Sequence, residues 1–232
     1  TDRGASGVAW YCAADGLGSS LELINPAMPN SYGQNWTSSS TLYGTPGKFN
    51  SQLKDDIAPL ILDVAHIPTI PSSTNSVIIT AKVIDELSSG VQNVTLFYRN
   101  HTAQNPSGFS SLQMFDDGKN GDGVVNDGIY GAVLSPMANR TIVEFYVQAT
   151  DVNGHSRTYP APVLETNGAN NTFGTTVQSA NALFQVDDEI ISNTMPYVKL
   201  VMTATDRAQF PPSNTSSDAE FNNTMISIDG AG

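Results

Sequence analysis

The stretch Phe115–Ala132, FDDGKNGDGVVNDGIYGA, decides the fold class of this chain. It holds four aspartates, two asparagines and five glycines in a single run. Glycine, asparagine and aspartate tolerate left-handed backbone angles, and Asn and Asp side chains readily bond their own backbone. The stretch therefore predicts a tightly folded turn region that connects strands, as in extracellular all-β modules.

Segments with strand-like alternation lie on both sides of this turn region. Val77, Ile79, Ala81 and Val83 would share one face of a strand, as would Val143, Phe145, Val147 and Ala149. About seven short strands of this kind over residues 59–163 predict an immunoglobulin-like β-sandwich. Because no long segment has helical periodicity, we expect an all-β protein.

The composition excludes several classes of partner. The net charge is −12, from 22 acidic and 10 basic residues, whereas binding to nucleic acid or to an anionic membrane needs clustered Lys and Arg. No apolar run approaches the ~20 residues that span a bilayer. Cys12 is the only cysteine, so an intrachain disulfide is impossible. An acidic surface rich in Ser, Thr, Asn and Gly is typical of secreted bacterial β-proteins, so we expect an extracellular or cell-surface location.

Turn and linker signals divide the chain into segments. We expect one segment over residues 1–51, the sandwich over 59–163, a polar Gly/Asn/Thr-rich linker over 164–181, and a last segment over 182–232.

The middle segment resembles the Ig-like modules of large bacterial exported proteins. The strand VTLFYR, the turn region FDDGKNGDGVVNDGIYGA and the strand VEFYVQATDVNG carry this resemblance. The first segment looks like the C-terminal half of a lamin-tail domain, through DGLGSSLEL at 15–23, Asn35-Trp36 and GTPG at 44–47. The two resemblances imply tandem Ig-like sandwiches of which the first is incomplete.

The last segment resembles the opening of a CotH-type spore-coat kinase domain. The matching residues are PYVKLVM at 196–202, Asp206, DAEFNNT at 218–224 and Asp229-Gly230. In that family the nucleotide-binding and metal-binding residues lie downstream of this opening. The resemblance therefore implies a second incomplete domain and assigns no catalytic residue to this chain.

One candidate site emerges from the residues, and it would bind calcium. Oxygen ligands suited to a hard cation come from Asp116, Asp117, Asn120, Asp122, Asn126 and Asp127. Their spacing does not match an EF-hand, and the alternative is a pair of linked turns whose Asx side chains cap backbone N–H groups. His66, His101 and His155 are far apart in sequence, and no close pair of zinc ligands exists. We expect no other cofactor, since no nucleophile elbow and no phosphate-binding glycine motif is present.

Two functions follow as hypotheses. The first is a non-catalytic structural or adhesive region of a secreted or cell-surface bacterial protein, with protein or cell-envelope partners. The incomplete first and last segments would favour strand exchange with another chain. The alternative is an accessory N-terminal region of a CotH-like secreted protein kinase, whose catalytic residues would lie beyond this chain.

Overall fold

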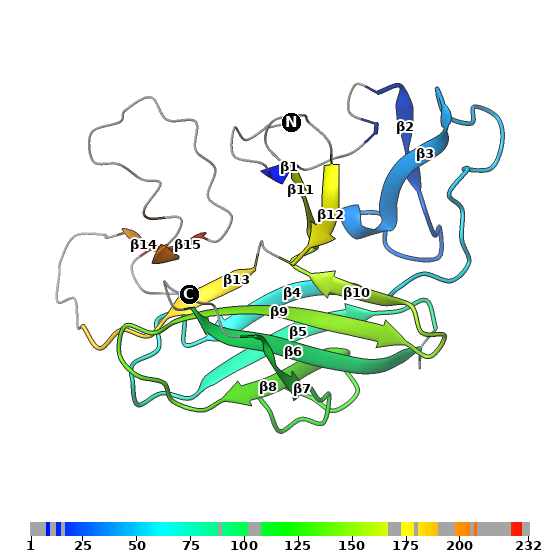
Figure 1. Cartoon of the computed structure of the whole chain (residues 1–232). Coiled ribbons are helices and arrows are strands. Elements are labelled where there is room, and N and C mark those ends of the chain that lie inside the picture. The colour runs from blue at the N-terminus through cyan, green and yellow to red at the C-terminus, as the bar shows by residue number, and fades with distance from the viewer. Residues whose placement is uncertain are drawn as a thin grey trace.

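The computed structural model shows an all-β protein, as predicted (Figure 1). It describes residues 8–9, 13–14, 17–87, 90–101, 108–166, 173–178, 181–189, 198–204, 207 and 224–228. Cys12 lies outside these residues. No helix in this described part is both long enough and apolar enough to cross a bilayer.

A two-sheet β-sandwich forms the centre of the molecule. One sheet has the order β4-β5-β8, formed by Leu60–Ile67, Val77–Ile84 and Ile129–Leu134. The other has the order β10-β9-β6-β7, formed by Ser156–Tyr159, Ile142–Asp151, Val91–His101 and Ser110–Gln113. All these neighbours are antiparallel. The Asp/Gly stretch lies between β7 and β8, and therefore connects one sheet to the other.

The core lies between the two sheets and follows the predicted alternation. In β5 the side chains of Val77, Ile79, Ala81 and Val83 are buried. In β9 the same holds for the predicted set of Val143, Phe145, Val147 and Ala149. Met114 and Leu134, which flank the Asp/Gly stretch, join this cluster. The turn region is thus anchored at both ends in the core.

Two stretches of the structure differ from the expected segments. β13 (Ala182–Gln185) pairs with residues 142–145 of β9 and so belongs to the sandwich rather than to the last segment. Phe184 explains this placement, because its fully buried ring stacks on His66 at 5.2 Å between centroids. The predicted linker, 164–181, contains two paired strands, β11 (Val163–Thr166) and β12 (Phe173–Val177).

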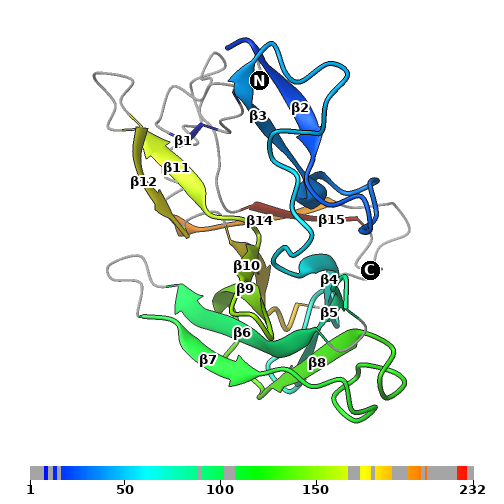
Figure 2. The same cartoon turned by 90° about the vertical axis from the view of Figure 1, so that its right-hand side faces the viewer.

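The remaining strands form small sheets next to the sandwich. β1 (Val8–Ala9) pairs with β11, which gives a three-stranded sheet of order β1-β11-β12. β2 (Ser19–Leu23) pairs with β3 (Trp36–Leu42), and β14 (Val198–Met202) pairs with β15 (Thr224–Ile228). Figures 1 and 2 both place β1-β11-β12 and β2-β3 on the same side of the sandwich. Because β1 pairs with β11, the start of the first segment lies beside the start of the predicted linker.

A second, smaller core joins the first segment to the sandwich. Met28 packs with Ile57, Leu60 and Leu62 in a buried cluster, with Ile24 and Ile84 at its margin. Gln34, in the short 3-10 turn Gly33–Asn35 (η1), extends the contact through its amide. Its Nε2 donates to the Ile61 carbonyl at 2.6 Å, and its Oε1 accepts from the Ile61 N–H at 2.9 Å. The side chain of Gln34 thus pairs with the backbone of β4 as a neighbouring strand would.

Candidate metal centre

The predicted calcium ligands lie in a turn region held by their own hydrogen bonds. Asp122 is fully buried, and its Oδ2 accepts from the N–H groups of Asp117 at 2.6 Å and Gly118 at 2.7 Å. Its Oδ1 accepts from the N–H of Asn120 at 3.0 Å. Burial raises the pKa of Asp122, but the three backbone N–H groups outweigh it and hold that pKa below its ordinary value. Asp122 therefore acts as an internal cap for the loop.

The other aspartates of the loop have similar backbone partners. Asp116 accepts from the N–H groups of Asp127 and Gly128, and Asp127 accepts from those of Val124 and Ile129. Asn126 has φ 62°, and four loop glycines also have positive φ, at positions 118, 121, 123 and 128. These contacts match the arrangement of linked turns. Calcium binding by the loop stays a prediction.

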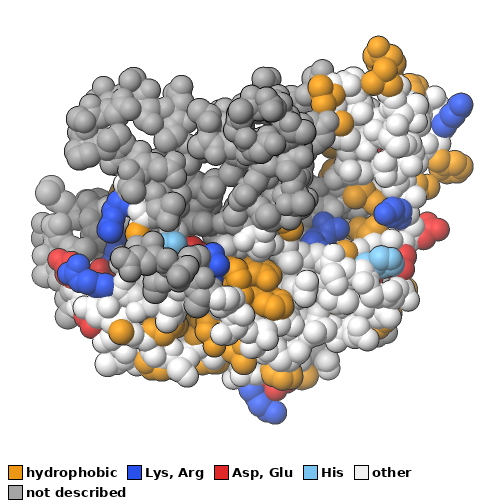
Figure 3. All heavy atoms as spheres, in the orientation of Figure 1, with side chains coloured by type: hydrophobic (Ala, Val, Ile, Leu, Met, Phe, Trp, Pro, Cys, Tyr) orange, Lys and Arg blue, Asp and Glu red, His pale blue; other side chains and the backbone are white. Residues whose placement is uncertain are grey.

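A different set of metal-ligating side chains converges at the end of the sandwich. The set is Asp56 in the segment before β4, Asp151 at the end of β9, and His155 in the β9–β10 turn. One ligand atom from each lies within 4.8 Å of the other two. Among the described residues, this is the only group of three His, Cys, Asp or Glu side chains that meets this distance. In Figure 3, acidic side chains and a histidine gather at this end of the sandwich.

The β9–β10 turn positions two of these side chains. Asp151 Oδ1 accepts from the N–H groups of Asn153 and His155, both at 2.8 Å, which closes the turn around Gly154 at φ 89°. His155 Nδ1 donates to Asp151 Oδ2 at 2.9 Å and lies 3.5 Å from Asp56 Oδ1. Asn153 Nδ2 donates to Asp56 Oδ2 at 2.9 Å. The turn therefore connects directly to the segment that precedes β4.

Charge and burial differ within the set. Asp151 is buried, whereas the side chain of His155 is 50% exposed and that of Asp56 is 40% exposed. The hydrogen bond to Asp151 raises the pKa of His155. Burial raises the pKa of Asp151, but hydrogen bonds from His155 and Asn153 outweigh it, so that pKa lies below its ordinary value. Asp151 is thus a persistent anion inside the fold.

Two more carboxylates follow β5 next to this set. The Oδ2 of Asp85 and the Oε2 of Glu86 are buried atoms without a hydrogen-bond partner. Their other oxygens accept from the N–H groups of Leu87 and Ile57, both at 2.9 Å. Burial raises the pKa of both groups, and the charges of Asp56 and Asp151 raise that of Asp85 further. Gly90 permits the arrangement, because a Cβ there would lie 1.9 Å from Asp85 Oδ1.

Asp85 also connects this end of the sandwich to the predicted loop site. A cleft of about 440 Å³ is lined by Asp85, Tyr130 and three of the predicted calcium ligands, Asp116, Asn126 and Asp127. The structure therefore brings these three side chains to one cleft. The other three predicted ligands, Asp117, Asn120 and Asp122, are not among the residues that line it.

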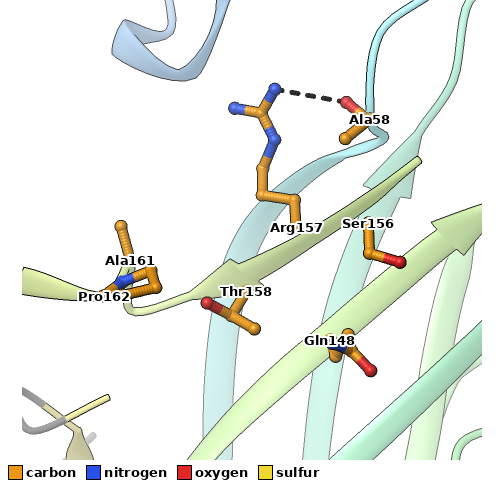
Figure 4. A pocket seen from close by; sticks show the side chains of 7 residues that line it. All are labelled: Ala58, Gln148, Ser156, Arg157, Thr158, Ala161 and Pro162. Carbon is orange, nitrogen blue, oxygen red and sulfur yellow. Dashed lines mark hydrogen bonds between the residues drawn. The ribbon is translucent and has the colours of Figure 1, made fainter. Parts of the chain in front are cut away.

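A second cleft, of about 350 Å³, surrounds Arg157 on β10 (Figure 4). Figure 4 shows the Arg157 side chain rising from β10 toward Ala58, away from the side chains of Ser156 and Thr158. Its guanidinium donates to the carbonyls of Gln34 at 2.6 Å and Ala58 at 3.2 Å, while its buried Nε has no partner. Burial lowers the pKa of Arg157. This cation ties the first segment and the segment before β4 to the sandwich.

Sequence reasoning missed Asp56, Asp151 and His155 because 95 positions separate Asp56 from Asp151. The available signal was local: the turn DVNGH at 151–155 places an acid and a histidine four residues apart around an Asn-Gly pair. The pairing of this turn with Asp56 depends on the fold alone.

The fold defines an all-β sandwich protein. No protein-family model matches the chain, and no curated protein sequence is similar to it. Among solved structures, it is similar to astrotactin-2, described as a conserved vertebrate-specific and perforin-like membrane protein involved in neuronal development. The match covers 64% of this chain and 25% of that chain, with 13% identity and a TM-score of 0.35.

Proposed function

We propose that this chain is a non-catalytic structural region of a secreted or cell-surface bacterial protein, in which it acts as a stiff spacer with adhesive contacts. The observation that supports this most directly is the joint between the first segment and the sandwich. A shared apolar cluster around Met28 and Leu60, the paired amide of Gln34, and the guanidinium of Arg157 all cross this joint. Such a joint transmits orientation from one module to the next, which a spacer requires.

Exposed apolar side chains support the adhesive part of the proposal. They cluster on and around the β2–β3 hairpin, where a partner or a donated strand could cover them. These residues are Leu17, Leu21, Leu42, Tyr43 and Phe49, and Phe49 is 87% exposed.

Distance measurements between two spin labels test the spacer. Labels at Ser40 in β3 and Ser111 in β7, both exposed, are introduced as cysteines after Cys12→Ser. We expect a single narrow distance distribution, because the joint fixes the two positions. Arg157→Ala should broaden it, whereas Lys119→Ala, which removes an 80% exposed cation, should not. A broad distribution in the otherwise unchanged protein would contradict the spacer proposal.

The alternative is an accessory region that positions a CotH-like kinase domain. The pair β14–β15 supports it, since these two strands form a sheet of their own beside the sandwich. ATP-dependent phosphorylation by a longer form of the protein, absent when the residues after 232 are removed, would favour this alternative over the spacer.

A further inference from the structure

The segment before β4 and the β9–β10 turn meet at one point, and each brings a carboxylate there. Asp56 and Asp151 approach the imidazole of His155 from two elements that are far apart in sequence. Asp151 is held in place by the N–H groups of its own turn, and Asp56 by the amide of Asn153. The fold therefore holds the three side chains close together, and an ion bound there would take the place of the proton on His155 Nδ1.

A second observation concerns two carboxylates next to this set. Asp85 Oδ2 and Glu86 Oε2 are buried oxygens without a hydrogen-bond partner. The other oxygen of Glu86 accepts from the N–H of Ile57, so this pair of carboxylates lies at the segment that carries Asp56. A buried acceptor without a partner is unfavourable, and a cation bound nearby would offset the charge of these carboxylates. The nearby Lys54 is exposed and has no ion pair among the described residues.

We propose that Asp56, Asp151 and His155 bind a divalent metal ion that fixes the segment before β4 to the β9–β10 turn of the sandwich. One imidazole nitrogen with carboxylate oxygens suits Zn²⁺ or Mn²⁺, because Ca²⁺ and Mg²⁺ favour oxygen-only sets. Asp85 and Glu86, which lie near Asp56, add negative charge that favours a bound cation. The ion would bridge Asp56 to the β9–β10 turn. Asp56 precedes Ile57, which belongs to the smaller core around Met28, called the joint core from here on.

Thermal unfolding of the tag-free, EDTA-treated protein tests the site, with Zn²⁺, Mn²⁺, Ca²⁺ and Mg²⁺ added separately. Ligand in 100-fold excess over its Kd should raise the Tm by about 5–10 °C for a chain of this size. We expect this increase with Zn²⁺ or Mn²⁺, with one ion bound per chain in titration calorimetry. Asp56→Asn and His155→Gln, at partly exposed positions, should each abolish it. Asp55→Asn is the matched control and should retain it.

Three results would overturn the proposal. The first is no Tm increase with Zn²⁺ or Mn²⁺, and the second is an increase that survives both Asp56→Asn and His155→Gln. The third is an increase with Ca²⁺ alone that Asp116→Asn removes and Asp56→Asn leaves intact, because that would place the ion in the Asp/Gly loop. If Asp56→Asn does not fold, as judged by circular dichroism in EDTA, the half-exposed His155→Gln variant decides.

Discussion

Asp122 shows how one side chain holds the loop that decides the fold. It is buried, and three backbone N–H groups donate to its two oxygens. Asp122→Asn would replace one acceptor oxygen by an NH₂ group that faces N–H donors. Since hydrogen bonds to a charged group contribute about 1.5–3 kcal/mol, we expect a loss of about 2–3 kcal/mol in the free energy of unfolding. Urea denaturation in EDTA measures it.

The control for that substitution is Asp55→Asn, at an exposed position. We expect a change within about 0.5 kcal/mol for it, as for most surface substitutions. An Asp122→Asn variant as stable as the Asp55→Asn variant would mean that the loop is held by its glycines alone.

Glu22 gives a pH dependence at the scale of a single residue. Its carboxylate accepts from Thr45 Oγ1 at 2.9 Å, Ser51 Oγ at 2.7 Å and the Gln52 N–H at 3.3 Å. Burial raises the pKa of Glu22, but these hydrogen bonds outweigh it and leave that pKa below its ordinary value of 4.5. A lowered pKa stabilises the fold above the unfolded-state pKa, and this contribution is lost as the pH falls through the folded-state pKa.

The measurement is the urea midpoint of the protein and of Glu22→Gln between about pH 6 and pH 3. Near neutral pH we expect a lower urea midpoint for Glu22→Gln than for the unaltered protein. The difference between the two midpoints should shrink as the pH falls toward about 3. Parallel curves for the two proteins across this range would show that the carboxylate contributes nothing through its charge.

At the scale of elements, the sequence predicted strands wherever burial on one face produced alternation. β5 and β9 are long, and their apolar side chains repeat every second residue, so local pattern sufficed. β11 and β12 lie in a stretch rich in Thr, Asn and Gly, and β11 pairs with Val8–Ala9, more than 150 positions away. No local sequence pattern predicts a pairing between strands so far apart in the chain. The same holds for Asp56, Asp151 and His155, the proposed metal ligands, which come together only when β4 and β9 lie in opposite sheets.

β13 is the element whose assignment to the sandwich can be tested most directly. Phe184 is fully buried between His66 and Phe145, with centroid distances of 5.2 and 6.2 Å. Because truncating a buried Phe to Ala typically costs 3–5 kcal/mol, we expect Phe184→Ala to lower the free energy of unfolding by about 3–4 kcal/mol. Chemical denaturation measures this loss. Leu200→Ala, in β14 and 49% exposed, is the control and should change stability by less than about 1 kcal/mol.

At the scale of the whole molecule, the joint core makes the first segment and the sandwich one cooperative unit. Met28 is 4% exposed and packs on Ile57, Leu60 and Leu62, so neither part can unfold without exposing residues of the other. Both tryptophans, Trp10 and Trp36, belong to the first segment. Their fluorescence therefore reports on that segment, while far-ultraviolet circular dichroism is dominated by the strands of the sandwich.

We expect the two signals to give one coincident urea transition in the unaltered protein. Met28→Ala should destabilise the protein by about 2–3 kcal/mol, since it leaves a cavity in the joint core. It should also move the fluorescence transition to lower urea than the circular dichroism transition, because the first segment would then unfold before the sandwich. Met137→Ala, at the margin of the main core, is the matched control and should keep the two transitions coincident. Separate transitions in the unaltered protein would show that the joint does not couple its two sides, and a stiff spacer would then need another source of rigidity.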